Sequence, residues 1–157
     1  MLYRKFYDEL VKWYKQEKKL ALLIDGARQI GKTTLIRQFA KDYYGDNFVE
    51  INFINTPSAK EIFVGDLSVD GIISKLTLFL RRPLTPHKTL IFFDEVQECL
   101  EVRTAIKFLV DDGRFDYIES GSLLGINYKE IKSYAVGYEE NRTMYPMDFE
   151  EFAIANG

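Results

Sequence analysis

Residues 22–40 read LLIDGARQIGKTTLIRQFA, and the order of apolar residues and glycines within them indicates the type of fold. It begins with a short apolar run that has the length of a buried strand, and it continues through a turn that contains Gly26 and Gly31. After Lys32 and Thr33 the apolar residues recur at helical spacing. The stretch therefore predicts a strand, a glycine-rich loop and a helix, in that order.

The loop matches the pattern G-x-x-x-x-G-K-[ST], which is typical of a phosphate-binding loop. Glycine lets the backbone fold tightly around an anion, and the helix that follows adds the positive end of its dipole. Lys32 would place its charge on the β- and γ-phosphates of ATP, and the Thr33 hydroxyl would ligate Mg²⁺. The predicted ATP-binding residues are Gly26, Ala27, Arg28, Gln29, Ile30, Gly31, Lys32, Thr33 and Thr34.

A second pattern, TLIFFDEVQE at 89–98, ends an apolar strand in two adjacent carboxylates. Unpaired carboxylates at a buried strand end are costly. A Mg²⁺ ion held by the phosphates and Thr33 would explain them, with Asp94 as the metal-binding acid of a Walker B motif. Glu95 is then the expected catalytic residue, which accepts a proton from an attacking water or orients that water. An acidic strand end that faces solvent is the alternative.

Along the rest of the chain, apolar runs of strand length alternate with helical patterns. Residues 55–68 are expected to be mostly loop. The predicted helices are 2–18, 33–44, 69–80, 99–112 and 148–155, and the predicted strands are 20–25, 47–53, 88–96, 115–120 and 139–145. This alternation indicates an α/β protein in which helices cover both faces of a parallel sheet. Ligands in such sheets bind beyond the carboxyl ends of the strands, where both motifs lie.

Five segments together resemble a known family: GARQIGKTTLIRQF, FVGDLS, LIFFDEVQE, ESGSLLG and MYPMDFEEF. They are similar to prokaryotic AAA-type P-loop ATPases of the AAA+-related, additional-strand, catalytic-glutamate division. The resemblance implies a three-layer αβα sandwich with a mainly parallel, five-stranded sheet in the order 5-1-4-3-2. These ATPases usually carry a C-terminal domain of unknown function. Residues 1–157 are therefore expected to be a single ATPase domain with an N-terminal helix in 1–19, truncated before that C-terminal domain.

The resemblance also gives roles to residues outside the two motifs. Either Ser122 or Ser120 would be the sensor-1 residue, whose hydroxyl contacts the γ-phosphate or the water, and a serine that only forms a turn is the alternative. Asn52 would hold Glu95 away from the water until activation. Relatives often have a basic residue where this chain has Tyr138, in Val136-Gly137-Tyr138, and Arg142 is out of register. An arginine finger would then come from another subunit or a missing domain, or be absent.

Two further expectations concern the surroundings of the nucleotide. Gln97 could help to place the water, although a surface glutamine is the simpler expectation. Phe6, Tyr7 or Trp13 would border the adenine. The family that the chain resembles often has an arginine near Arg4, close to that edge of the site, and the sequence does not rank these residues.

Composition and charge limit the classes of partner that the sequence favours. The chain is 46% hydrophobic and 29% charged, as is usual for a globular protein, and its net charge of −3 gives no general attraction to nucleic acid or anionic membranes. No apolar run approaches the ~20 residues of a membrane span. The only cysteine, Cys99, cannot form an internal disulfide, which fits a reducing cytoplasm.

The sequence therefore predicts a cytoplasmic, Mg²⁺-dependent ATPase whose hydrolysis drives a conformational change in an unidentified partner or domain. The isolated chain would be weakly active, and it could form an oligomer. A nucleotide-dependent switch with little turnover is the alternative. A small-molecule P-loop kinase is a further alternative, although the Asp94–Glu95 pair suits activation of water and no arginine-rich lid is evident.

Overall fold

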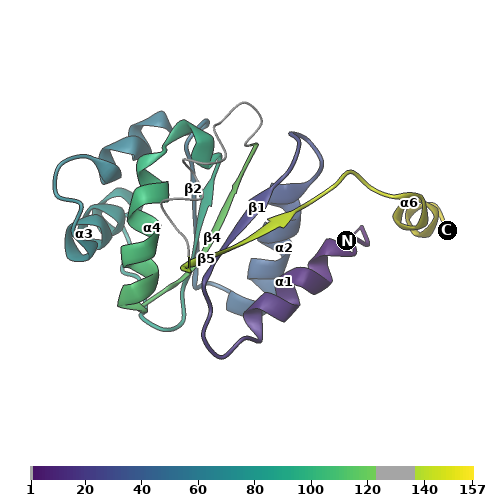
Figure 1. Ribbon diagram of the computed structural model, residues 1–157, viewed down its shortest axis with the longest axis horizontal. Helices are drawn as coiled ribbons and strands as arrows, with labels where there is room; N and C mark the ends of the chain where they lie inside the picture. The colour runs from purple at the N-terminus through teal and green to yellow at the C-terminus, as the bar shows by residue number, and fades with distance from the viewer. Residues whose placement is uncertain (1, 123–136) are drawn as a thin grey trace.

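The structure of the protein is a computed structural model, and it is described for residues 2–122 and 137–157. Five strands form one sheet with helices on both of its faces (Figure 1). The strands are β1 (Ala21–Asp25), β2 (Phe48–Asn52), β3 (Leu90–Asp94), β4 (Asp116–Gly121) and β5 (Glu139–Thr143). The helices are α1 (Phe6–Tyr14), α2 (Lys32–Tyr44), α3 (Val69–Leu80), α4 (Glu101–Asp112) and α6 (Phe149–Ala155), with short 3₁₀-helices η1 (Pro57–Phe63) and η2 (Val96–Glu98).

The sheet is parallel throughout and has the order β2-β3-β4-β1-β5. Read from the other edge, this is 5-1-4-3-2, so the predicted P-loop sandwich is confirmed. The register aligns the strand ends, because Asn52 is opposite Asp94, Asp94 is opposite Ser120, and Ser120 is opposite Ile24. The polar groups at the ends of three strands are therefore brought to one edge of the sheet.

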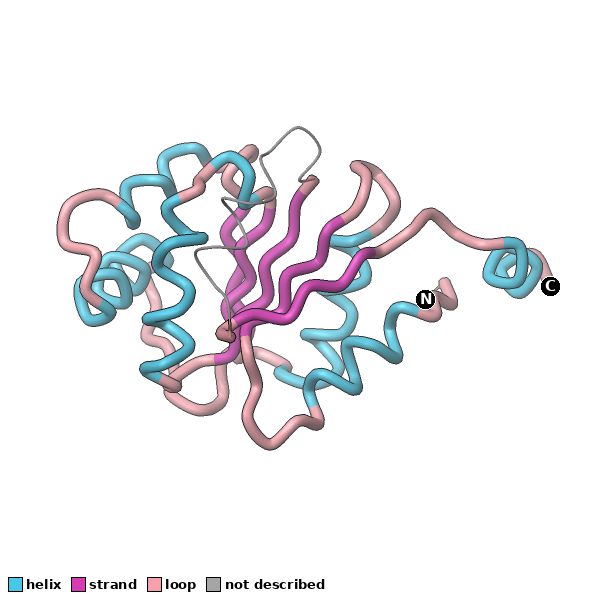
Figure 2. The backbone as a smooth tube through the Cα atoms, viewed as in Figure 1, coloured by secondary structure: helices cyan, strands magenta, loops and turns pink. Residues whose placement is uncertain are grey.

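Strand β1 shows why the buried strands read as continuous apolar runs. Leu22 and Ile24 pack with residues of α1 and α2, whereas Ala21 and Leu23 pack in the opposite core with residues of η1, α3 and α4. Successive side chains of a strand point to opposite faces, and here both faces are covered by helices (Figure 2).

Two predicted elements differ from the structure. The helix expected at 2–18 spans only Phe6–Tyr14, and the residues before it run to the C-terminal segment, where Lys5 pairs with Asp148. Residues 57–63, expected as loop, form η1, which begins at Pro57 and buries Ile62 and Phe63 in the core. Proline suits the first turn of a helix because its missing N–H is not needed there. The expectations for residues 123–136 lie outside the described residues.

A buried ion triad joins α4 to the sheet. Arg103 on α4 donates to Glu119 of β4 and to Glu139 of β5, with distances of 2.8 Å from Nη1 to Glu119 Oε1 and from Nη2 to Glu139 Oε1. Burial raises the pKa of Glu119, the Glu139 carboxylate adds to this effect, and Arg103 opposes it. One arginine thus compensates two carboxylates between three elements.

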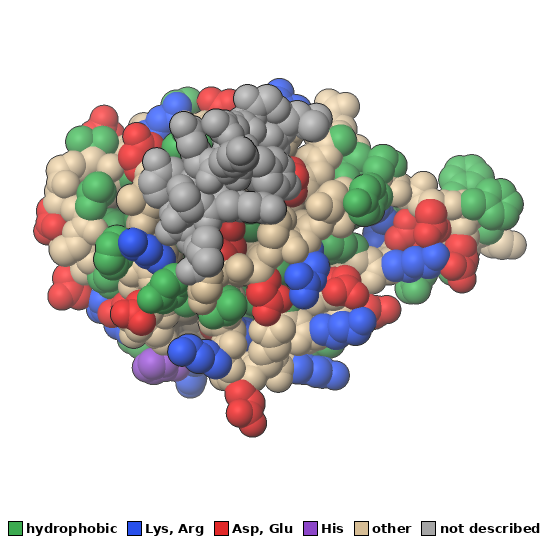
Figure 3. All heavy atoms as spheres, viewed as in Figure 1, with side chains coloured by type: hydrophobic (Ala, Val, Ile, Leu, Met, Phe, Trp, Pro, Cys, Tyr) green, Lys and Arg blue, Asp and Glu red, His purple; other side chains and the backbone are tan. Residues whose placement is uncertain are grey.

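Helix α6 extends away from the sheet at the end of the segment that follows β5 (Figures 1 and 2). Its Phe149, Phe152 and Ile154 are 86%, 58% and 52% exposed, and hydrophobic side chains are visible on this projection in Figure 3. Within the described ranges, no helix combines the length and apolar character needed to cross a membrane.

Candidate nucleotide-binding site

The loop between β1 and α2 folds tightly around the Lys32 side chain. Lys32 is the first residue of α2, and its Nζ donates to the Gly26 carbonyl at 2.8 Å and to the Ala27 carbonyl. A Cβ atom at Gly26 would lie 2.4 Å from the carbonyl oxygen of Met144, so only glycine fits this approach. Gly31 has a φ of 92°, a conformation that glycine adopts without strain. The two glycines of the motif are thus required by the loop geometry.

A hollow of about 310 Å³ lies beside this loop. Its lining residues are Arg28, Gln29, Gly31, Lys32, Thr33, Thr34 and Glu95. Two cationic side chains and the N-terminus of α2 favour an anion here. Burial lowers the pKa of Lys32, while Glu95 and Asp94 raise it by smaller amounts. A phosphate group would compensate the buried ammonium more completely than the backbone carbonyls do.

The two predicted metal-binding residues are in direct contact. Asp94 is 1% exposed, and its Oδ2 accepts hydrogen bonds from Thr33 Oγ1 at 2.7 Å and from Asn52 Nδ2 at 3.3 Å. Burial raises the pKa of Asp94, and the Thr33 hydrogen bond lowers it in part. A divalent cation favours an ionised carboxylate, and a hydroxyl with a carboxylate is a ligand set suited to Mg²⁺. The side chains present therefore fit Mg²⁺, and its binding stays a prediction.

Glu95 lines the hollow and is held by an unexpected partner. Its backbone is left-handed, with φ 59° and ψ 47°, and its Oε2 accepts a hydrogen bond from Gln97 Nε2 at 2.5 Å. Gly121 makes room for Gln97, because a Cβ there would lie 2.3 Å from Gln97 Oε1. Gln97 is half-buried, so it is not the surface residue expected from the sequence. Asn52 donates to Asp94 and not to Glu95, so the expected restraint on Glu95 by Asn52 is not present in this structure.

The two sensor candidates lie at the end of β4. Ser120 is fully buried opposite Asp94, and its Oγ has no hydrogen-bond partner among the described residues. Ser122 is half-buried just beyond the strand. Neither is among the described residues that line the hollow, and the choice between them stays open.

A second hollow, of about 280 Å³ and mostly apolar, adjoins the first. Its lining residues are Leu2, Arg4, Gly31, Thr34, Leu35 and Gln38. Gly31 and Thr34 line both hollows, and an apolar hollow beside the one expected to bind phosphate (the phosphate hollow) suits the planar adenine base. Phe6, Tyr7 and Trp13 do not line it. No pattern in the sequence indicated Leu2, because only the fold brings the N-terminal segment to α2.

Arg142 is close in sequence to Tyr138, where the resemblance led us to expect a basic residue, and its side chain forms ion pairs at the surface. It lies on β5, where it forms ion pairs with Glu140 at 3.2 Å and with Glu9 at 3.7 Å. It does not line the phosphate hollow. Among the described residues, the cationic side chains that do so are Arg28 and Lys32.

Comparisons with known proteins bear on the family and the fold of the chain. The model of the family described as AAA domain matches residues 18–153. An uncharacterized protein of Methanocaldococcus jannaschii is 27% identical over 130 residues, which cover 83% of this chain and 27% of that protein. A katanin chain from a structure of katanin self-assembly matches with a TM-score of 0.54 at 14% identity, over 90% of this chain and 47% of the other. The chain thus spans less than half of either relative.

Proposed function

The chain belongs to the AAA domain family, and we propose that it binds ATP with Mg²⁺ and hydrolyses the ATP. The observation that carries this proposal is the 2.7 Å contact between Thr33 Oγ1 and Asp94 Oδ2. It joins the two motifs across 61 residues, at the place where β3 ends and α2 begins. Family membership supports nucleotide binding at a general level.

Each residue has a separate task in this proposal. Lys32 and the N-terminus of α2 bind the phosphates, and Lys32 exchanges its two backbone carbonyls for phosphate oxygens. Thr33 and Asp94 would hold Mg²⁺, which supplies positive charge to the phosphates when bound. Glu95 accepts the proton of the attacking water on its carboxylate, while Gln97 fixes the other carboxylate oxygen.

The hydrolysis is proposed to act on a further domain or a separate protein, since the chain spans 27% of its archaeal relative. A nucleotide-dependent switch with slow turnover is the second candidate function. It is favoured by the surface ion pairs that engage Arg142, because phosphoryl transfer without an arginine finger on the γ-phosphate is slow. Either function is compatible with a cytoplasmic protein whose single thiol, Cys99, is buried.

Single-turnover hydrolysis by the parent and by Glu95→Gln separates these candidates. We expect similar ATP affinity in both proteins, because the substitution keeps the size and hydrogen-bonding capacity of the side chain. The variant should turn over about 10²–10⁴-fold more slowly, because it lacks the base. Equal rates in an active parent would exclude Glu95 as the catalytic residue. Tight binding without turnover in both proteins would favour the switch.

A further inference from the structure

The C-terminal segment MYPMDFEEF, at 144–152, has no part in the two hollows but returns to the N-terminus of the chain. Asp148 caps α6 by accepting from the Glu151 N–H at 2.8 Å, and Glu151 Oε2 accepts from the Asp148 N–H at 2.9 Å. The other oxygen, Glu151 Oε1, accepts from the Lys5 N–H at 2.8 Å. Glu151 is 5% exposed although it lies on a projecting helix. The first turn of α6 is therefore anchored to residues that precede α1.

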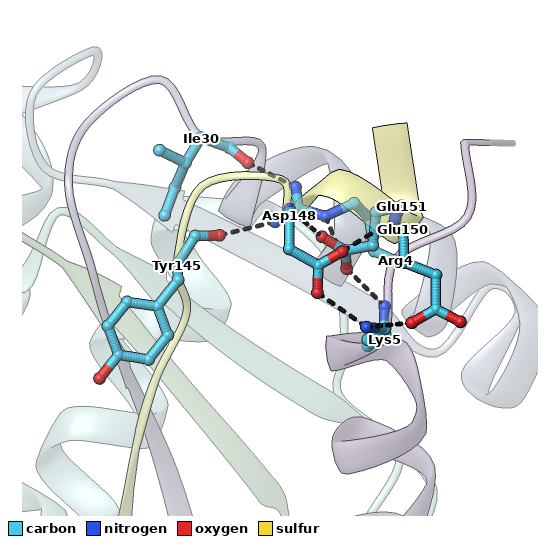
Figure 4. Close-up of polar contacts among 7 residues, drawn as sticks. All are labelled: Arg4, Lys5, Ile30, Tyr145, Asp148, Glu150 and Glu151. Atoms are coloured by element: carbon cyan, nitrogen blue, oxygen red, sulfur yellow. Dashed lines mark hydrogen bonds and ion pairs between the residues drawn. The ribbon is translucent and has the colours of Figure 1, made fainter. Parts of the chain in front are cut away.

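Arg4 connects this anchor to the phosphate-binding loop (Figure 4). Its Nη1 donates to the Ile30 carbonyl at 2.8 Å, and its Nη2 donates to the Tyr145 carbonyl at 2.7 Å. Its Nε lies 3.4 Å from Glu151 Oε1. Arg4 is 8% exposed, so the guanidinium is largely withdrawn from water and depends on these partners. All three nitrogens of its guanidinium engage acceptors, a geometry that a lysine cannot reproduce.

The contact with Ile30 determines how the next peptide group is turned. The peptide between Ile30 and Gly31 is trans, so the Ile30 carbonyl and the Gly31 N–H point in opposite directions. Arg4 binds the carbonyl, and the Gly31 N–H is therefore directed away from Arg4. Gly31 lines the phosphate hollow, whereas Arg4 does not. Because glycine permits many backbone conformations, an anchored carbonyl restricts a peptide that could otherwise rotate.

We propose that Arg4 is a positioning residue that orients the Ile30–Gly31 peptide for phosphate binding, and that Tyr145 and Glu151 hold Arg4 for this task. The inference rests on the proposed nucleotide binding and adds a role for the C-terminal segment. Glu151 contacts neither hollow, yet it contributes to phosphate affinity through Arg4. Binding linkage is reciprocal, so a bound nucleotide also stabilises the attachment of α6.

The test compares four variants with the parent by calorimetry with Mg-ATP. Arg4→Gln should raise the Kd by about 10- to 100-fold, the effect of losing a charged hydrogen-bond donor. Glu151→Gln keeps one oxygen that can accept from the Asp148 N–H, but it loses the charge and the second acceptor that face Lys5 and Arg4, and we expect a rise of about 3- to 10-fold. The double variant should bind no more weakly than Arg4→Gln alone, because Glu151 is proposed to act only through Arg4. Glu150→Gln is the matched control, since Glu150 also pairs with Lys5 but does not contact Arg4, and its Kd should stay within about twofold.

A second measurement reports on the peptide without nucleotide. The amide resonance of Gly31 in the free protein should shift in Arg4→Gln and in Glu151→Gln, and it should keep its position in Glu150→Gln. Thermal unfolding identifies any variant that is not folded, and Glu151→Gln carries the test if Arg4→Gln does not fold.

The outcomes separate this inference from the proposed function. If Lys32→Ala loses ATP binding while Arg4→Gln and Glu151→Gln bind like the parent, the positioning role of Arg4 is wrong and the proposal of nucleotide binding stands. If Arg4→Gln and Glu151→Gln both fold and the Gly31 resonance is unchanged in both, the positioning role of Arg4 is also wrong. A parent protein that binds no ATP overturns both proposals.

Discussion

Replacing Lys32 by alanine tests the nucleotide site most directly. In the free protein, Lys32 Nζ donates to the Gly26 carbonyl at 2.8 Å and to the Ala27 carbonyl. Binding exchanges these neutral acceptors for anionic phosphate oxygens, so the variant loses the difference between the two sets of contacts. A hydrogen bond to a charged group contributes about 1.5–3 kcal/mol, and we expect a loss of about 2–3 kcal/mol in binding free energy. This corresponds to a Kd for Mg-ATP that is about 30- to 150-fold higher.

Isothermal titration calorimetry measures this change, and Lys41→Ala is the control because Lys41 is an exposed lysine of the same helix. Burial lowers the pKa of Lys32 below its usual 10.5. The charged ammonium is the form that binds phosphate, so the affinity of the parent should fall as the pH rises towards this lowered pKa. Lys32→Ala should lack that decrease. A folded Lys32→Ala protein that binds ATP within about threefold of the parent would refute the assignment of the phosphate-binding loop.

Three further variants test the surroundings of the loop. Asp94→Asn should bind ATP with a weakened dependence on Mg²⁺, because an amide is a poor ligand for the ion. If titrations with and without Mg²⁺ match those of the parent, Asp94 is not a ligand. Gln97→Met keeps the size of the side chain and removes the donor to Glu95, so kcat should fall about tenfold or more while the Kd for ATP is unchanged. A kcat equal to that of the parent would show that the 2.5 Å contact has no catalytic role. Arg103→Met leaves the buried Glu119 and the half-buried Glu139 without their counter-charge, so the free energy of unfolding should fall by about 3–5 kcal/mol in urea denaturation. An unchanged value would show that the triad does not need its arginine.

The sequence predicted the parts of the site that depend on local pattern. The glycine-rich loop and Asp94 lie in continuous motifs, and the alternation of apolar runs was enough to place them at the carboxyl edge of a parallel sheet. The partner of Glu95 was not predicted, because Gln97 is held in place by the absence of a side chain at Gly121, on another strand. The expectation for Asn52 came from resemblance alone, and small differences in side-chain direction decided that it contacts Asp94.

Contacts between segments that are distant in the sequence could not be predicted from motifs or apolar periodicity. Arg4 and Glu151 are separated by 147 residues, and their pairing follows only when the course of the chain ends is known. The N-terminal helix was overestimated for the same reason. Residues 15–19 read KQEKK and offer no apolar side chain to a helix face, and a helix gains most of its stability from packing of its apolar face.

The two edges of the described sheet determine how another chain can approach it. Strand β5 reads EENRT and contains no large apolar side chain, and on β2 the carboxylate of Glu50 is paired with Arg37 at 2.7 Å. A strand added to either edge would have to strip water from these charges, a feature by which proteins avoid continued sheet growth and aggregation. Association by shared β-structure is thereby disfavoured at β5. Among the described helices, α6 instead presents its exposed phenylalanine rings.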